Sequence, residues 1–478
     1  MRCPTWLARL DGANPHDHPP LSPALERSPP PPCLSILQEW NDQQAKEEGY
    51  PKRFGVRIPL GPLPASYKVV HITETHHSVP FPTALGSNPY QPGVAFVLPE
   101  PSVTLFCDPA TPRSLAAFHE ANEALISIRL STYSDCVSVG VTAPHGVFDG
   151  KGICLVLKAI QAELHGEEWV APPLFTENQC VKGVEELLDA TRHDPAASIA
   201  AGLAKGGMLS HVRSITHIFD LAKFLFTKLF IDPLLHSGTR KSAFVARELL
   251  EPLVAQAKAE VAAQGKGEYV STQDVVTAWF LRAALAGEKK KRKTLAFSGT
   301  FCFRSVVDKH TSADLSAYPH SCVWAFPMTP SPSFAQVASA PLSSLALTHR
   351  RSLLRARSPA ALAGLFRYMK RYHWRILVPR AGWGVEPFFL TNQVEAAMPS
   401  AVDWSAIVPG VPKGGGRGCF WEWSTPQGMD HFMVLNEVQN GWLWSGGMRK
   451  TRWASLEKAL AELEEDAADD SKLDEEKY

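Results

Sequence analysis

Alternating apolar and polar residues predict a β-hairpin in the first third of the chain. The alternation runs over residues 126–130 and, after a polar stretch, over 137–143. A period of two is typical of strands that bury one face. Directly downstream, apolar residues recur at helical spacing over 153–164, and Gly166 ends that pattern. We therefore expect a hairpin followed by an amphipathic helix.

Similar patterns predict strands and helices in both halves of the chain. Ser271 or Thr272 is placed to cap one of these helices, because a short hydroxyl side chain accepts hydrogen bonds from the free amides of a first turn. The mixture is typical of an α/β or α+β fold. The expected strands are 69–73, 94–98, 103–107, 294–304, 388–391, 432–437 and 442–448, and the expected helices are 112–122, 249–263, 274–282 and 453–465.

Length and composition indicate the size of the protein and the class of its ligand. The chain has 478 residues, of which 45% are apolar, and this is enough for two domains of similar size. Its formal net charge is zero, and no long basic face is interleaved with aromatic residues. We therefore expect a small-molecule ligand and no nucleic-acid partner.

The sequence also carries signals about location. No run of eighteen uncharged apolar residues occurs, and charged residues interrupt the best candidate, 215–235. The first ten residues lack the apolar core of a signal peptide. Nine cysteines are scattered without a Cys-x-x-Cys pair, as in proteins that keep reduced thiols inside the cell. We expect a cytoplasmic monomer with no membrane span.

One short motif carries candidate chemistry. His145, Asp149 and Gly150 form a His-x-x-x-Asp-Gly sequence between the predicted hairpin and the predicted helix. An imidazole held at a strand end can take a proton from a hydroxyl or an amine near neutral pH, because its ordinary pKa is about 6.5. The motif therefore indicates group transfer with His145 as general base. The alternative is a histidine in an ordinary turn that Asp149 caps.

Other catalytic patterns fail on spacing. The pair His119-Glu120 lacks the second histidine of a zinc-protease helix. The spacing of His71, His76 and His77 does not give a set of three metal ligands, so surface or turn histidines are the favoured interpretation. The segment 146–151 is one residue short of a phosphate-binding loop, and no Gly-x-Ser-x-Gly elbow occurs. We therefore expect neither a metal site nor a nucleotide triphosphatase.

The motif and three further segments resemble one family. The stretch 134–150 with its helix, the segment 269–279 with its Ser-Thr-x-Asp helix opening, and the strand 300–305 followed by the turn 318–321 are similar to the BAHD-type coenzyme A-dependent acyltransferases. These enzymes are related to chloramphenicol acetyltransferase (CAT). The chain looks most like their fungal secondary-metabolism members.

The resemblance implies an architecture of two CAT-like domains. Each domain is a mixed β-sheet flanked by helices, and a solvent channel runs between them. The implied parts are a Pro-rich, partly disordered leader (1–50), an N-terminal CAT-like domain with the motif (51–205), a helical crossover (206–243), a C-terminal CAT-like domain (244–465) and an acidic tail (466–478).

The resemblance also implies a reaction. An acyl group would move from acyl-CoA, the co-substrate, to a hydroxyl or amine of a small acceptor in a ternary complex, with His145 as the base. Asp149 would turn away from His145 and pair with Arg304, so that Asp149, Gly150 and Arg304 support the catalytic loop. Removing one partner of such a buried pair costs on the order of 3 kcal/mol or more.

The chain departs from the family near its end. The Asp-Phe-Gly-Trp-Gly signature is reduced to a segment containing Asp403 and Trp404, for which a packed turn is the favoured interpretation. The oxyanion-stabilising segment reads Thr391-Asn392-Gln393, so Thr391 and Asn392 are the candidates for oxyanion or substrate contacts. These changes leave a non-catalytic binding protein as an alternative. A carrier-protein-dependent condensation domain is another, although Pro144 stands where such domains usually have a second histidine.

Overall fold

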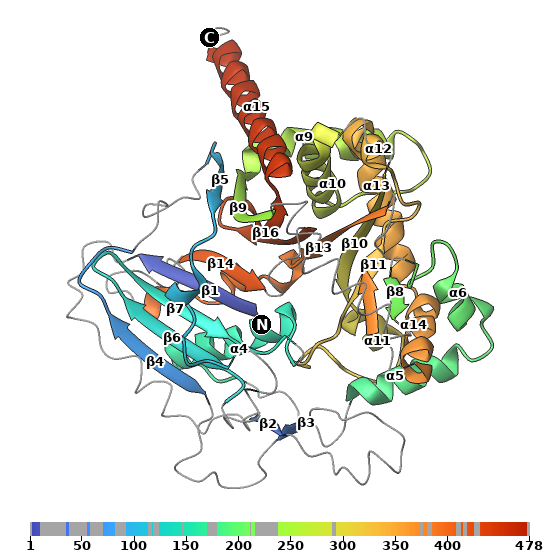
Figure 1. The fold of residues 1–478 in the computed structure, drawn as a ribbon, viewed down its shortest axis with the longest axis horizontal. Helices are drawn as coiled ribbons and strands as arrows, with labels where there is room; N and C mark the ends of the chain where they lie inside the picture. Colours follow the sequence, from blue (N-terminus) through green and yellow to red (C-terminus); the bar gives the residue numbers. More distant parts are fainter. Residues whose placement is uncertain are drawn as a thin grey trace.

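A computed structural model shows two large β-sheets flanked by helices (Figure 1), with two further sheets of two strands each. It describes residues 2–9, 35–37, 55–57, 70–81, 92–112, 117, 124–145, 147–169, 179–210, 212–215, 238–288, 293–372, 376–379, 385–407, 413, 418–424 and 431–475.

The first sheet has five strands in the order β14-β1-β7-β6-β4. The predicted hairpin is confirmed, because β6 and β7 pair antiparallel from Ser127↔Thr142 to Thr132↔Val137. The parallel pairing of β4 with β6 makes the sheet mixed. Its strands are β1 (Arg2–Arg9), β4 (His71–His76), β6 (Ser127–Thr132), β7 (Cys136–Thr142) and β14 (Gly418–Ser424).

The second sheet has seven strands in the order β11-β10-β13-β15-β16-β9-β5. Strands β10, β13 and β15 run parallel to one another and the other neighbours are antiparallel, so this sheet is mixed as predicted. Its strands are β5 (Ala95–Pro99), β9 (Gly238–Ala246), β10 (Thr294–Cys302), β11 (Val323–Pro327), β13 (Val385–Asn392), β15 (His431–Val438) and β16 (Gly441–Arg449).

Several helices lie against the sheets, and α15 projects away from them (Figure 1). Helix α4 starts at the motif, and α9, α10, α12 and α13 cover one face of the seven-stranded sheet. The helices of the described residues include α4 (Gly150–His165), α5 (Gln179–Ala190), α9 (Arg247–Ala262), α10 (Thr272–Leu285), α11 (Arg304–His310), α12 (Phe334–Ser339), α13 (Leu342–Ala356), α14 (Pro359–Arg371) and α15 (Lys450–Glu475).

Several predicted elements are confirmed with their caps. The C-cap of α4 is Gly166, which adopts a left-handed conformation with φ 64°. Ser271 caps α10 and forms a capping box with Asp274. The predicted helix 249–263 and the predicted strands 388–391, 432–437 and 442–448 correspond to α9, β13, β15 and β16. The predicted strand 294–304 corresponds to β10, but β10 ends at Cys302 and Arg304 begins α11.

One expected strand is wrong, and two segments have regular structure that the sequence analysis did not assign. Residues 103–107 contain a 3-10 turn (Val103–Leu105) instead of a strand, because the Ser102 hydroxyl accepts from the Thr104 amide and starts a helical turn. Residues 2–9, expected in the leader, form a strand between β7 and β14. The last helix continues to Glu475, so most of the expected acidic tail is helical.

Some predicted elements lie outside the residues that the structure describes. They include most of the helix at 112–122 and most of the 206–243 crossover. The domain boundaries and the channel stay predictions. Two strands cross between the halves of the chain, because β5 joins the seven-stranded sheet and β14 joins the five-stranded sheet.

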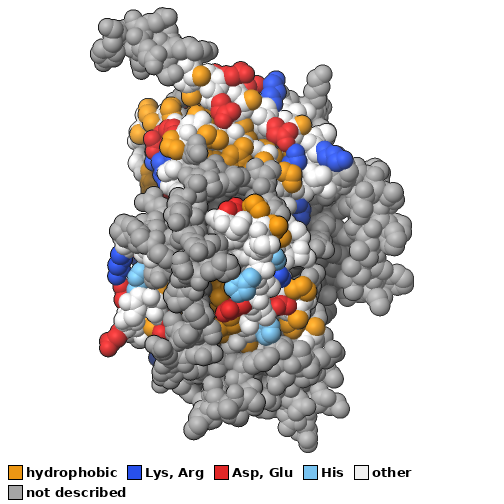
Figure 2. All heavy atoms as spheres, turned by 90° about the vertical axis from the view of Figure 1, so that its left-hand side faces the viewer, with side chains coloured by type: hydrophobic (Ala, Val, Ile, Leu, Met, Phe, Trp, Pro, Cys, Tyr) orange, Lys and Arg blue, Asp and Glu red, His pale blue; other side chains and the backbone are white. Residues whose placement is uncertain are grey.

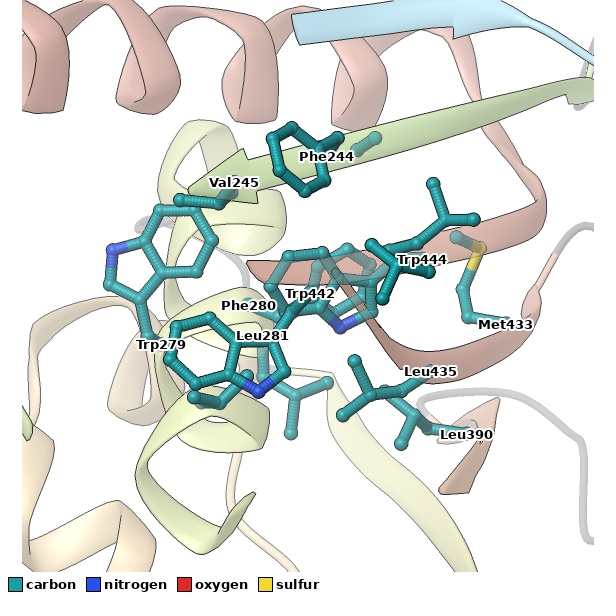
Figure 3. Close-up of a cluster of buried hydrophobic side chains, with 14 of the residues drawn as sticks. Phe244, Val245, Trp279, Phe280, Leu281, Leu390, Met433, Leu435, Trp442 and Trp444 are labelled. Carbon is teal, nitrogen blue, oxygen red and sulfur yellow. The ribbon is translucent and has the colours of Figure 1, made fainter. Parts of the chain in front are cut away.

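Aromatic side chains fill the core between the seven-stranded sheet and α10 (Figure 3). Trp444 on β16 stacks on Phe280 with ring centroids 5.1 Å apart and lies 5.8 Å from the ring of Trp279. The same apolar cluster continues through Val141 to Leu157 of α4. One core therefore connects both sheets with the helix that follows the motif.

Charged side chains on the face shown in Figure 2 do not form a single-sign patch. Among the side chains drawn in colour, Lys and Arg lie scattered between acidic and apolar ones. Within the described part of the chain, no helix combines the length and the apolar composition that a membrane span requires.

Candidate functional site

The motif forms a tight turn between β7 and α4. The amides of Val147 and Phe148 both donate to the carbonyl of Pro144, at 2.9 and 3.1 Å. His145 lies inside this turn, and its side chain is partly buried. The structure thus places His145 where the sequence pattern predicts it, between the end of a strand and the start of a helix.

Asp149 caps the helix that follows. Its Oδ1 accepts from the Gly152 amide at 2.8 Å, which satisfies one of the free amides at the N-terminus of α4. Gly150, the first residue of α4, is buried. A carboxylate at this position also interacts favourably with the helix dipole.

Asp149 also pairs with Arg304 in a buried, two-point ion pair. The guanidinium Nη1 donates to Oδ2 at 2.8 Å and Nη2 donates to Oδ1 at 3.0 Å. Asp149 is 3% exposed and Arg304 1%. Burial alone would lower the pKa of Arg304, but the hydrogen bonds and charge of Asp149 raise it, so this guanidinium is always charged. Asp149 is therefore both cap and ion-pair partner.

Arg304 ties a third segment to the motif. Its Nε donates to the Tyr318 carbonyl at 3.0 Å, and its Nη2 donates to the His320 carbonyl. A Cβ on Gly152 would stand 1.9 Å from the Pro319 carbonyl oxygen, so only glycine allows this approach. We call residues 318–322 the clamp segment, because they bond to the turn that contains His145 from the side of the seven-stranded sheet.

The clamp segment bonds directly to the turn. The Ser321 amide donates to the Val147 carbonyl at 3.0 Å, and the Cys322 amide donates to Asp149 Oδ2 at 2.8 Å. Phe148 and His320 form an antiparallel β-bridge. The turn that contains His145 is thus held by backbone bonds as well as by the ion pair.

His320 is a residue of the site to which the sequence analysis gave no role. Its Nδ1 lies 3.2 Å from the Val147 carbonyl, and its ring packs against Phe148 and Tyr318. Burial lowers the pKa of His320 to about 4, although the bond to Val147 opposes this shift. The ring is neutral near pH 7, and Nδ1 carries the proton because a carbonyl can only accept. The sequence signal that could have pointed to His320 is its place in the Tyr-Pro-His-Ser turn.

The oxyanion candidates lie at the end of β13. Successive residues of a strand point to opposite faces, so Thr391 and Asn392 cannot serve the same site. Phe388 faces α10, which places Leu390 on that face and Thr391 on the opposite one. Asn392 Oδ1 accepts from the Val394 amide at 3.0 Å. Gln393 is buried, and its backbone amide donates to the Leu435 carbonyl at 2.8 Å.

The segment around Asp403 docks on the far end of α4. Trp404 is 2% exposed, so the favoured interpretation of a packed turn is confirmed. His165 Nε2 lies 3.1 Å from the Asp403 carbonyl, and the Asp403 amide donates to Gln161 Oε1. Helix α4 is therefore fastened at both ends to chain segments from the C-terminal half.

Metal ligands are not gathered at this site. Within the described ranges, no three His, Cys, Asp or Glu side chains have a geometry that would hold a metal ion.

The ion pair should be needed for stability. Asp149→Ala leaves Arg304 charged and buried without its carboxylate, and we expect a loss of about 3–5 kcal/mol in the free energy of unfolding. Urea denaturation followed by circular dichroism measures it. Asp189→Ala is the control, because its pair with Arg192 is exposed and should change stability by about 0.5 kcal/mol or less. A loss for Asp149→Ala as small as the control's would contradict the buried pair.

His320 should make the protein sensitive to acid. In the unfolded chain His320 binds a proton below pH 6.5, whereas in the folded chain it stays neutral down to about pH 4. The free energy of unfolding therefore falls as the pH drops from 6.5 to about 4. The loss is about 3 kcal/mol. Urea denaturation from pH 7 to pH 4 should show this loss in the native protein and a smaller one in His320→Asn, which does not titrate. Equal profiles would refute the prediction.

The chain is similar in sequence to known fungal proteins. No family model matches the chain. The O-acyltransferase pboC of Aspergillus ustus is 28% identical over 257 residues, which cover 53% of this chain and 49% of pboC. The chain thus spans about half the length of this curated relative.

Solved structures match nearly the whole chain. TRI101 of F. graminearum, crystallised with coenzyme A and deoxynivalenol, superposes with a TM-score of 0.62 at 12% identity, covering 95% of this chain and 93% of TRI101. The first condensation domain of the calcium-dependent antibiotic synthetase superposes with a TM-score of 0.54 at 17% identity, covering 97% and 91%. The predicted resemblance is confirmed: the chain has the CAT-like fold of TRI101 and is similar in sequence to fungal acyltransferases.

Proposed function

We propose that this protein is an enzyme that moves an acyl group from acyl-CoA to a hydroxyl or amine of a small acceptor, with His145 as general base. The observation that carries this proposal is the turn containing His145, which the buried Asp149–Arg304 pair and the clamp segment hold in place. The similarity to pboC and the fold shared with TRI101, which was crystallised with coenzyme A, support the same reaction.

In the proposed mechanism His145 accepts the acceptor's proton while the oxygen or nitrogen attacks the thioester carbonyl. The tetrahedral oxyanion then collapses and expels the coenzyme A thiolate, which takes the proton from the imidazolium. Donor and acceptor are bound together, and no acyl-enzyme forms.

The hydrogen bonds of Asp149 support an anchoring role in place of a charge relay. A carboxylate offers about four acceptor sites. Gly152 and Arg304 occupy Oδ1, and Arg304 and Cys322 occupy Oδ2. No acceptor site is left for His145, so Asp149 acts by holding the loop.

Thr391 fits the role of oxyanion donor better than Asn392 does. Its hydroxyl is buried, with 3% of the residue exposed, and among the described residues nothing pairs with Oγ1. It lies on the sheet face away from α10, and the chain that leaves β13 runs through short 3-10 turns packed against α4. An unpaired buried hydroxyl can donate to a developing negative charge.

The alternatives make distinct predictions. A condensation domain would take its acyl group from a carrier protein. The fold shared with the synthetase domain is compatible with this alternative. A binding protein without turnover would release no thiol. We propose the coenzyme A-dependent reaction because Pro144 takes the place of the second histidine that condensation domains usually carry.

Replacing His145 should abolish turnover without unfolding the protein. We expect His145→Ala to lower the rate of coenzyme A release by about 10²–10⁴-fold, since a general base contributes that much. Free thiol is measured with a panel of acyl-CoA donors and candidate alcohols and amines, and circular dichroism checks the fold. Normal turnover by His145→Ala would refute the mechanism, and no thiol release by the native protein would refute the activity.

Thr391→Val should separate catalysis from stability. We expect kcat to fall by about 10²-fold with little change in KM, because the hydroxyl would act only on the oxyanion. Stability should stay equal or rise, since the lost hydroxyl makes no hydrogen bond. The control is Thr191→Val, whose hydroxyl donates to the Leu187 carbonyl at 2.7 Å and should lower stability but not kcat. Unchanged kcat in Thr391→Val would remove Thr391 from the mechanism.

A further inference from the structure

Two cysteines lie close together beside the clamp segment. The sulfurs of Cys180 and Cys322 are 3.9 Å apart although 142 residues separate them along the chain. Both are free thiols. Cys322 is fully buried, whereas Cys180, in the first turn of α5, is only partly buried. A reagent in solution therefore has access to one member of the pair.

The packing of α5 fixes this short separation. A Cβ on Gly183 would stand 2.4 Å from Val307 Cγ1, so α5 lies directly against α11. Three residues further on, Glu186 accepts from the Ser312 amide at 2.7 Å and from its hydroxyl at 2.6 Å. The helix that carries Cys180 therefore has little freedom to move away from Cys322.

Cys322 is also part of the clamp segment. Its amide donates to Asp149 Oδ2 at 2.8 Å, next to the bonds from Arg304. A displacement of the Cys322 side chain would therefore act directly on the hydrogen bond between the Cys322 amide and the Asp149 carboxylate, which caps α4.

The two thiols differ in reactivity. The hydrogen bond with Cys322 lowers the pKa of the Cys180 thiol, burial opposes this shift, and the Arg304 guanidinium adds to it. The same hydrogen bond and burial raise the pKa of Cys322. Because the thiolate is the nucleophile, we expect Cys180 to react with an oxidant before Cys322 does.

We propose that Cys180 and Cys322 are a modification site at which hydrogen peroxide forms a disulfide. The Cys180 thiolate attacks one peroxide oxygen, the O–O bond breaks, hydroxide leaves, and Cys180 becomes a sulfenic acid. The Cys322 sulfur then attacks the Cys180 sulfur, the S–O bond breaks, and water leaves with the thiol proton. The two thiols lose two electrons in total, and the peroxide gains them.

Disulfide formation should disturb the catalytic turn. The sulfurs must approach from 3.9 Å to about 2.05 Å, and α5 is held by α11 and Ser312. The clamp segment therefore has to supply part of the movement, which displaces the Cys322 amide from Asp149. This consequence for activity rests on the proposed acyl transfer, but the disulfide itself does not.

The disulfide is tested directly by mass spectrometry. The native full-length protein is treated with hydrogen peroxide, digested without reductant and searched for the peptide that joins Cys180 to Cys322. We expect this cross-link in the native protein and in Cys136→Ala, a control that removes a different buried thiol, and its absence in Cys180→Ala. Peroxide treatment that gives no 180–322 cross-link in the native protein would overturn the proposal.

The effect on turnover is measured on the same samples. We expect peroxide to lower thiol release from acyl-CoA at least about tenfold in the native protein, to spare Cys180→Ala, and to be reversed by dithiothreitol. A cross-link without loss of turnover would overturn the coupling to the turn. If the reduced native protein releases no thiol, the proposed function fails, while the cross-link result still decides the modification site.

Discussion

The Asp149–Arg304 ion pair is the constraint on which the rest of the site depends. Its two residues are 155 positions apart: Asp149 caps α4, and Arg304 is the first residue of α11, just after β10. Two buried charges are stable only when each is paired and hydrogen-bonded, and here the helix cap, the Cys322 amide and the clamp carbonyls complete the bonding. The pair thus fixes the position of the turn that contains His145.

The same constraint explains why so much of the molecule converges on α4. The clamp segment holds its N-terminal end, and Asp403 contacts Gln161 and His165 at its C-terminal end. Two strands, β5 and β14, belong to the sheet of the opposite half of the chain. The two halves are therefore bound together by shared strands and by a shared helix, and the turn that contains His145 lies where they meet.

Sequence patterns predicted the local parts of this arrangement well. The hairpin, α4 with its Gly166 cap and α10 with its Ser271 cap follow from periodicity and capping, which act over a few residues. The pairing of Asp149 with Arg304 followed only from the family resemblance, because no local pattern joins residues so far apart. Residues 103–107 were assigned wrongly since a short apolar run fits a strand and a helical turn equally well. The bond from His320 to Val147 and the Cys180–Cys322 contact depend on how distant segments pack, and the sequence holds no periodic signal for either.

The claim that Asp149 anchors the loop, and does not relay charge to His145, is tested most directly by a double-mutant cycle on turnover. The rate of coenzyme A release is measured for the native protein, Asp149→Asn, Arg304→Met and the double variant. If the two residues act only as one anchor, the double variant should be no slower than the slower single variant. Losses that multiply in the double variant would show that Asp149 acts on the reaction independently of Arg304, and would contradict the account.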